Sequence, residues 1–246
     1  MNQTSKYKEV IVVDRFSQDG LAEFARTKGA TVIPSNANRS GARNLGLQNA
    51  LSTGVLFVDA DMILPPTLIE ECERGLVNHE ALVIPEKSIG VGFWAQCKAT
   101  ERAMHIGNEK LEAARCFRKG SLVSLGGYRV SLESGEDWDL HNRAMASSLS
   151  IGRTDAVILH DVGRLSLSLL LKKEYRYGKS FGRYLRMNPG IGYSQVNPLR
   201  RIVRPSLKAF LSTPKYGVGI LTMTSLEFAA AGLGHVVGDR EYGAVC

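Results

Sequence analysis

Cysteine is scarce in this chain of 246 residues, and its four thiols lie far apart in the sequence. Cys72, Cys97, Cys116 and Cys246 show no paired spacing and have no companion histidines of the kind that a zinc site needs. The low cysteine content disfavours a disulfide scaffold, and a reduced, cytosolic chain is the simplest interpretation. Aromatic residues are few, at 7%, but hydrophobic residues reach 44%, which is enough for one large folded domain or two small ones.

Long uninterrupted hydrophobic runs are also lacking. Residues 1–9 are polar and lack the apolar core of a signal peptide, so the sequence suggests no export. The most apolar stretch, residues 215–238, carries Glu227 in its middle and is interrupted by glycines. It is therefore a poor transmembrane span. We expect either a buried helix or a helix that lies shallowly in a membrane surface.

Acidic residues are nearly absent from one stretch, and this absence accounts for the net charge of +7. Residues 1–163 hold 18 Lys and Arg against 20 Asp and Glu, residues 164–215 hold 12 against 1, and residues 216–246 hold 1 against 3. In the basic stretch the cations are mixed with leucine and aromatic residues. Such a mixture is typical of an amphipathic helix at a membrane surface, and it also fits an RNA-binding helix or a solvated surface helix.

Short apolar runs alternate with segments of helical periodicity. The pattern predicts strands at residues 9–14, 30–33, 55–58, 81–85 and 156–159, helices at residues 18–28, 40–52, 67–78 and 136–145, and a long periodic stretch at residues 94–115. We expect Gly54 to close the second helix as its C-cap. This alternation indicates an α/β fold with a mostly parallel sheet covered by helices. In such sheets ligands bind beyond the carboxyl ends of the strands.

Acidic residues follow two of the predicted strands. Asp14 ends the first strand, and Asp59 and Asp61 follow the strand at residues 55–58. Two carboxylates so close together can approach one hard cation, and oxygen ligands of this kind suit Mg²⁺ or Mn²⁺ bridged to a diphosphate. Aspartate is equally common in loops and as a helix cap, so this pattern alone leaves a structural role open.

A second group of acids stands at the start of a predicted helix. Glu136, Asp137 and Asp139 surround a tryptophan there. The helix dipole favours acids in a first turn, and a carboxylate in this place could also serve as a general base. His160 lies next to Asp161 at the end of an apolar strand. A lone histidine is usually structural, and its neighbours in space decide whether it is a ligand.

Six motifs carry a resemblance to a known family. In chain order they are VVDRFSQDG (residues 12–20), GARNLGLQNA (41–50), VLFVDAD (55–61), GGY (126–128), GEDWDL (135–140) and LHDVG (159–163). Their ordered combination resembles the family 2 glycosyltransferases with the GT-A fold. The resemblance implies a Rossmann-like mixed, mostly parallel sheet flanked by helices. It also implies a catalytic core at residues 1–163 and a basic and apolar helical extension at residues 164–246.

The resemblance implies a role for each candidate residue. Asp14 would contact the nucleoside, Asp59 would bind the ribose, and the Arg43–Asn44 pair would lie near the donor. Asp61 would bind the diphosphate through Mn²⁺ or Mg²⁺. His160 would complete the metal shell or touch the diphosphate. Loops such as residues 86–93 would select the sugar and the acceptor.

The implied reaction is transfer of a sugar, with inversion, from a nucleoside-diphosphate sugar to an acceptor hydroxyl. Asp137 would be the catalytic base, supported by Glu136, and the metal would offset charge on the departing diphosphate. A lipid phosphate is already a nucleophile and needs no base. The acid pair therefore favours a sugar hydroxyl on a lipid-linked glycan over a bare polyprenyl phosphate, which stays an alternative acceptor.

The resemblance is incomplete at the front of the chain. Family members begin with a strand, a base-binding loop and a helix before the strand that corresponds to residues 9–14. Here residues 1–6 resemble only the tail of that helix, so we expect the first strand-helix unit to be missing. This departure leaves a catalytically inactive GT-A-like binding protein as an alternative function.

Residues 172–185 resemble the basic region, rich in Tyr and Gly, that follows the core in members acting on lipid-linked sugars. We therefore expect a peripheral protein on the cytoplasmic face of an anionic membrane. A nucleotidyltransferase would need a Gly-rich phosphate loop near the N-terminus, and none is visible. No nucleic-acid partner is expected, because the core lacks a recognised binding module.

Overall fold

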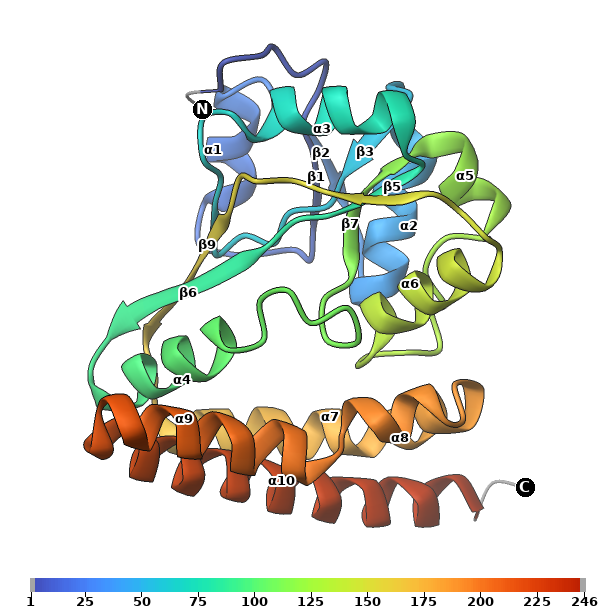
Figure 1. Ribbon diagram of the computed structural model, residues 1–246. Helices are drawn as coiled ribbons and strands as arrows, with labels where there is room; N and C mark the ends of the chain where they lie inside the picture. The colour runs from blue at the N-terminus through green and yellow to red at the C-terminus, as the bar shows by residue number, and fades with distance from the viewer. Residues whose placement is uncertain (1–2, 244–246) are drawn as a thin grey trace. The chain divides into compact units, whose positions relative to one another are not determined.

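The structure, a computed structural model, describes residues 3–243 and the side chains of residues 3–238 (Figure 1). By its contacts the chain divides into two compact units that interleave along the sequence. Unit 1 consists of Met1–Val58, Pro65–Ile84 and Ala113–Ala156, and unit 2 of Asp59–Leu64, Pro85–Glu112 and Val157–Cys246. The expected division into a core at residues 1–163 and an extension at residues 164–246 stays a prediction.

Unit 1 holds two sheets and five helices within the described residues. Its helices are α1 (Leu21–Thr27), α2 (Arg39–Asn49), α3 (Leu68–Asn78), α5 (Lys119–Ser124) and α6 (Glu136–Ala146). Strands β1 (Ile11–Asp14) and β2 (Thr31–Pro34) pair in parallel. The other strands are β3 (Gly54–Leu56), β5 (Ala81–Val83), β7 (Ala114–Arg118) and β8 (Ile151–Arg153), in the order β3-β7-β5-β8.

The core of unit 1 forms where this four-stranded sheet meets its helices. Phe57, just after β3, stands edge-on to the rings of Phe117 and Tyr128, with centroids 6.4 and 5.1 Å away. Leu47 of α2 and Leu140 of α6 join the same buried cluster. These helices also carry candidate site residues, so the core fixes the framework of the site.

Unit 2 consists of one small sheet and a set of helices. Strands β4 (Met62–Ile63), β9 (Ile158–Arg164) and β6 (Glu86–Val91) form the sheet in that order. The helices are α4 (Phe93–Ala103), α7 (Leu167–Met187), α8 (Ile191–Gln195), the π-helical segment η1 (Leu199–Val203), α9 (Arg204–Ser212) and α10 (Pro214–Gly243). Cys97, Ile220 and Met223 are fully buried in its core.

Glycines let α7 and α10 approach each other closely (Figure 1). A Cβ atom at Gly178 of α7 would overlap the carbonyl oxygen of Ala231, and one at Gly234 of α10 would overlap that of Tyr175. Gly232 differs, because its missing Cβ would point into open space. The glycines that interrupt the apolar stretch are therefore mostly helix contacts.

Helix α10 is long and apolar enough to cross a membrane by length and composition, over Pro214–Gly238 with a mean hydropathy of 1.4. Only 28% of its most apolar window is buried. Length and composition alone are weak evidence, because the core helix of a soluble protein can meet the same two criteria. Glu227, in its middle, is buried and accepts hydrogen bonds from Lys98 Nζ at 2.9 and 3.1 Å. One face of α10 therefore packs within unit 2.

Three expectations from the sequence were wrong in detail. Gly54 does not cap α2, which ends at Asn49, because the Glu9 carboxylate accepts the amides of Leu51 and Ser52 outside the helix. Gly54 instead begins β3. Residues 86–93, expected as a loop, contain β6, and residues 94–115 contain both α4 and the start of β7. Both strands depend on partners that are distant in sequence.

The mixed α/β class is confirmed, but parallel pairings are not the majority. Within the described residues three pairings are parallel, β1-β2, β5-β8 and β6-β9. Three are antiparallel, β3-β7, β4-β9 and β5-β7. Each antiparallel pairing joins strands that are distant in sequence, and the apolar pattern does not encode strand direction.

The described thiols are free. Cys72, Cys97 and Cys116 are all buried. A hydrogen bond with Cys72 and burial raise the pKa of the Cys116 thiol well above its usual value. Cys246 lies outside the described residues.

Candidate functional site

Asp14 lies at the carboxyl end of β1 in unit 1, where the sequence predicts a nucleoside contact. Its carboxylate accepts hydrogen bonds from the amide of Ser17 at 3.1 Å and from the Ser17 hydroxyl. Its backbone oxygen accepts the amide of Ser35 at 2.8 Å. Asp14 therefore stabilises the turn after β1 in this structure, and its contact with a nucleoside stays a prediction.

Two arginines of α2 bind the acids at the start of α6. Arg43 is buried, and its Nη1 atom lies 2.6 Å from Asp137 Oδ1 and 3.4 Å from Glu136 Oε1. The Nη1 atom of Arg39 lies 3.0 Å from the same Glu136 oxygen. The guanidinium of Arg43 also stacks over the ring of Tyr128, 5.0 Å from its centroid. The sequence motifs GARN, GGY and GEDWDL thus meet in unit 1.

Asn44 holds the GGY segment in place. Its side-chain amide donates to the carbonyl of Tyr128 at 2.7 Å and accepts the Tyr128 amide at 2.8 Å. Gly127 has a φ of +65°, and a Cβ there would lie 2.6 Å from the Asn44 oxygen. Asn44 therefore positions the ring that packs against Arg43.

The three acids of α6 have different surroundings. Asp139 is fully buried and binds Arg129 at 2.7 Å and Arg143 at 2.8 Å, so it is structural. Glu136 is also buried, and burial, followed by the neighbouring charge of Asp137, raises the pKa of its carboxyl. The side chain of Asp137 is 33% exposed. Asp137 is thus the most accessible carboxylate of the three.

A second group of predicted site residues meets in unit 2. His160 Nε2 lies 3.0 Å from Asp61 Oδ2, although 99 residues separate them in the sequence. Antiparallel pairing of β4 with β9 places Met62 opposite His160, and the amide of Asp161 donates to the carbonyl of Asp61 at 2.8 Å. Asp59 lies in the preceding turn, where its carbonyl accepts the amide of Met62 at 3.1 Å.

The other ring nitrogen of His160 has two neighbours that the sequence did not suggest. Arg102 donates from Nη1 to Nδ1 at 3.0 Å and to Ser88 Oγ at 3.1 Å. Glu86 Oε2 lies 3.6 Å from the same Nδ1. Because an arginine can only donate, Nδ1 accepts and Nε2 carries the hydrogen that faces Asp61. Binding of a metal by Nε2 would require the ring hydrogen to be on Nδ1, so Arg102 would need another acceptor and Glu86 would be the nearest carboxylate for that hydrogen.

Asp61 and His160 fit a divalent cation that is shared with a substrate. They offer one exposed carboxylate and one imidazole nitrogen, and Mg²⁺ is usually held by one or two carboxylates together with substrate phosphates. Within residues 3–243 no group of three or more His, Cys, Asp or Glu could hold a metal ion. The pair therefore does not form a cage made of protein ligands alone.

The structure thus brings together some of the predicted residues within each unit. Arg43, Glu136 and Asp137 meet in unit 1, which also holds Asp14. Asp61 and His160 meet in unit 2. Arg102 and Glu86 were missed, since one lies in an ordinary amphipathic helix and the other at the start of an unpredicted strand.

Comparison with known protein families gives one match. The model of the family described as glycosyl transferase family 2 matches residues 1–123, which is half of the chain. In a comparison with curated proteins, none matches the chain.

Solved structures similar to this chain include a mannosyltransferase and S. aureus TarS. The mannosyltransferase PcManGT from Pyrobaculum calidifontis, in complex with GDP-Man and Mn²⁺, has a TM-score of 0.66 and 16% identity, over 96% of this chain and 80% of that one. S. aureus TarS 1–349 in complex with UDP-GlcNAc has a TM-score of 0.54 and 16% identity, over 99% of this chain and 85% of that one. At these identities the likeness shows the fold alone, and it confirms the predicted GT-A fold.

Proposed function

The chain belongs to glycosyl transferase family 2, and we propose that it is an inverting, metal-dependent enzyme of this family. In the proposed reaction it moves a sugar from a nucleoside-diphosphate sugar to an acceptor hydroxyl of a lipid-linked glycan. The observation that carries the proposal is the ion pair between Arg43 and Asp137, which holds an accessible carboxylate at the start of α6.

Asp137 acts as the general base in this proposal. It removes the proton of the acceptor hydroxyl while that oxygen forms a bond to the anomeric carbon and the bond from this carbon to the diphosphate oxygen breaks. A single displacement of this kind inverts the anomeric centre. Arg43 fixes the orientation of the carboxylate, and Glu136 supports the arrangement by binding both Arg43 and Arg39.

Asp61 and His160 are the proposed metal ligands. Mn²⁺ or Mg²⁺, when bound, supplies positive charge for the departing nucleoside diphosphate. The 3.0 Å approach of the two side chains supports this assignment, as does the presence of Mn²⁺ and GDP-Man with the similar mannosyltransferase PcManGT. Asp59, Asp14 and Arg43 are the proposed contacts of the donor nucleotide.

Transfer to a hydroxyl needs a base, whereas transfer to a bare polyprenyl phosphate, the alternative acceptor, does not. Asp137 has no role in proton removal if the nucleophile is already an anion. Its accessibility and its fixed orientation therefore favour a hydroxyl acceptor.

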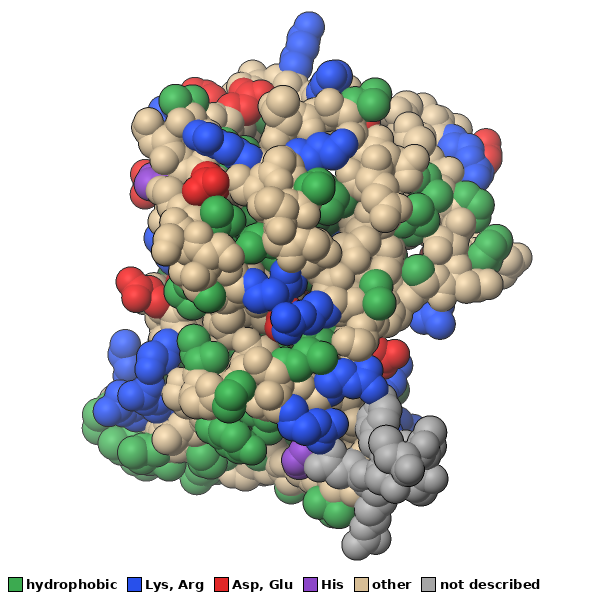
Figure 2. All heavy atoms as spheres, turned by 90° about the vertical axis from the view of Figure 1, so that its right-hand side faces the viewer, with side chains coloured by type: hydrophobic (Ala, Val, Ile, Leu, Met, Phe, Trp, Pro, Cys, Tyr) green, Lys and Arg blue, Asp and Glu red, His purple; other side chains and the backbone are tan. Residues whose placement is uncertain are grey.

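We also propose that the protein binds the cytoplasmic face of an anionic membrane. Figure 2 shows hydrophobic side chains along the lower edge of the protein in that view, with Lys and Arg side chains above them. Eight exposed hydrophobic residues belong to α9 and α10, namely Leu207, Phe210, Leu211, Val218, Leu221, Leu226, Leu233 and Val236. An apolar surface next to basic residues is favourable at an anionic lipid surface.

Hydrolysis of nucleoside-diphosphate sugars, measured with Mn²⁺ and with a chelator, tests the proposed metal-dependent transfer. We expect release of the nucleoside diphosphate to require the metal and to fall sharply in Asp61→Ala. A matched control is Asp155→Ala, because Asp155 is an exposed acid in unit 1. Equal background release from the wild type and both variants, with or without metal, would instead support an inactive binding protein.

A further inference from the structure

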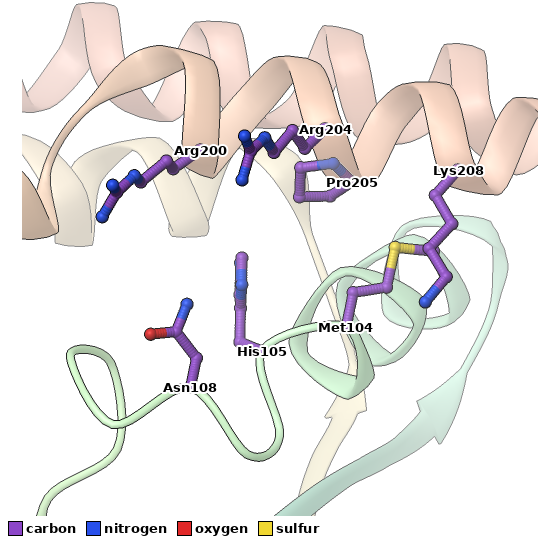
Figure 3. Close-up of a pocket in the computed structure, with 7 residues that line it drawn as sticks. All are labelled: Met104, His105, Asn108, Arg200, Arg204, Pro205 and Lys208. Carbon is purple, nitrogen blue, oxygen red and sulfur yellow. The ribbon is translucent and has the colours of Figure 1, made fainter.

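A pocket of about 230 Å³ in unit 2 is lined mainly by basic and polar side chains (Figure 3). The residues that line it are Met104, His105, Asn108, Arg200, Arg204, Pro205 and Lys208. The proposed transfer reaction assigns a role to none of them. The lining contains three permanent cations and no acid.

The three cations are arranged for a common ligand. Arg200, Arg204 and Lys208 recur every four residues along η1 and α9, so they share one face of the helical segment. Figure 3 shows the helix that bears them facing the loop that carries His105 and Asn108. Among the described residues none of the three cationic side chains makes an ion pair or a side-chain hydrogen bond.

The acid behind the pocket does not neutralise this charge. Glu101 is almost fully buried, and its carboxylate lies 3.3 Å from Lys98 Nζ and 2.9 Å from His105 Nε2. Burial favours the neutral acid, but the charge of Lys98 and the hydrogen bond from His105 outweigh it and hold the pKa of Glu101 well below its usual range. Its charge therefore interacts with Lys98 and His105. Glu109 lines a second hollow together with Arg200, but no ion pair joins these two side chains among the described residues.

We propose that this pocket binds a phosphate group, supplied by the headgroup of an anionic membrane lipid. A guanidinium can donate two parallel hydrogen bonds to a phosphate, and a lysine adds a point charge. Arg200 and Arg204 supply the two guanidinium groups, and the amide of Asn108 is a further donor. The volume of the pocket fits a headgroup phosphate and leaves the lipid chains outside.

The apolar residues of the same helical segment favour a lipid as the source of the phosphate. Leu199, Val203, Leu207 and Leu211 form a row beside the cations, and each of them is exposed, from 46% for Val203 to 79% for Leu211. A helix with an apolar row next to a basic row lies in the membrane interface, with its cations at the level of the phosphates. One segment thus offers contacts for both parts of a lipid.

This phosphate site goes beyond the proposed transfer reaction, and only its lipid source rests on the proposed membrane binding. The test is binding of the full chain to phosphatidylcholine vesicles that contain phosphatidic acid. The pocket variant is Arg200→Gln/Arg204→Gln/Lys208→Gln. Its matched control is Lys6→Gln/Lys8→Gln/Arg74→Gln, which removes the same charge from exposed positions of unit 1. All of these side chains lie on the surface, so both variants are expected to fold.

We expect the pocket variant to bind these vesicles at least tenfold more weakly than the control variant. Equal weakening in the two variants would show a general charge effect and overturn the pocket as a lipid site. Binding of the pocket variant as tight as that of the wild type would also overturn it. Asp137→Asn, which removes the proposed base, is expected to bind vesicles like the wild type, so a failed transfer reaction and a failed pocket give different results.

A titration with inorganic phosphate, in the absence of vesicles, separates the two sources of the ligand. We expect phosphate to bind weakly to the wild type, and the response to disappear in the pocket variant. If phosphate binds and vesicle binding is the same in both variants, the ligand is a soluble phosphate and the lipid assignment is wrong. A wild type that binds no anionic vesicle would contradict both the membrane proposal and the lipid source.

Discussion

The Nη1 atom of Arg43 lies 2.6 Å from the Oδ1 atom of Asp137, and this ion pair joins α2 to α6 in unit 1. The arginine is buried, whereas a third of the aspartate side chain is exposed. The buried arginine therefore fixes the Asp137 carboxylate on one side, and the other side of the carboxylate is accessible to solvent. This asymmetry separates Asp137 from Glu136 and Asp139, which are both buried.

Replacing Arg43 should be costly for stability. Arg43→Met leaves the buried Glu136 without one of its cations, and loss of a buried partner costs about 3 kcal/mol. Arg39 is the control, because its side chain is 46% exposed and Arg39→Met should cost less than about 1 kcal/mol. Urea denaturation measures both values. Equal costs for the two variants would show that Arg43 does not hold the acid cluster together.

The acids of α6 should differ in what they contribute to folding. Asp139→Asn should lower the free energy of unfolding by about 3 kcal/mol, because it leaves Arg129 and Arg143 without their buried anion. Asp137→Asn should change it by less than about 1 kcal/mol, since Asp137 is partly exposed. Thermal unfolding of the two variants makes the comparison. A larger loss for Asp137→Asn would assign Asp137 a structural role.

The raised pKa of Glu136 predicts a dependence of stability on pH. The folded protein keeps the Glu136 proton to a higher pH than the unfolded chain, where glutamate titrates near about 4.3. In the window above that value the folded state binds more protons, so this group makes stability fall as pH rises. In Glu136→Gln the decline of stability above the pKa of the unfolded glutamate should be smaller than in the wild type. Unchanged slopes in chemical denaturation would refute the assignment.

The close contact of α7 with α10 should not tolerate a methyl group. Gly234→Ala places a Cβ against the carbonyl of Tyr175, and overpacking of this kind costs about 1–3 kcal/mol. Gly232→Ala, two residues earlier on the same helix, meets open space and should raise stability by about 0.5–1 kcal/mol. Opposite signs of the two changes in melting temperature are expected. Two stabilising changes would mean that the helices do not pack as described.

Much of the fold and of the site could be predicted from local sequence patterns. The alternation of strands and helices predicted most elements of unit 1. The ordered motifs predicted the GT-A fold and assigned both Asp61 and His160 to the metal site. Asp61 and His160 are 99 residues apart in the sequence, and the antiparallel pairing of β4 with β9 brings them together. Some of the motifs mark the ends of elements, since VVDRFSQDG contains the end of β1 and GEDWDL contains the start of α6.

The rest depended on contacts between distant parts of the chain. Strand β6 has no alternating apolar pattern and exists through its parallel pairing with β9, so Glu86 was taken for a loop residue. In the sequence, Arg102 is one of many charged residues on a helix. In the structure, strands β6 and β9 place Ser88 and His160 beside it. Nothing in the local sequence distinguishes such residues.

The role of Asp137 is the central claim, and sugar transfer by Asp137→Asn tests it most directly. The assay follows the transfer of sugar from a nucleoside-diphosphate donor to a hydroxyl acceptor in the presence of Mn²⁺. General-base catalysis contributes about 10²–10⁴-fold, so we predict that kcat falls by a factor in this range, while the melting temperature and the donor affinity stay unchanged. Transfer within a few-fold of the wild-type rate would contradict the account.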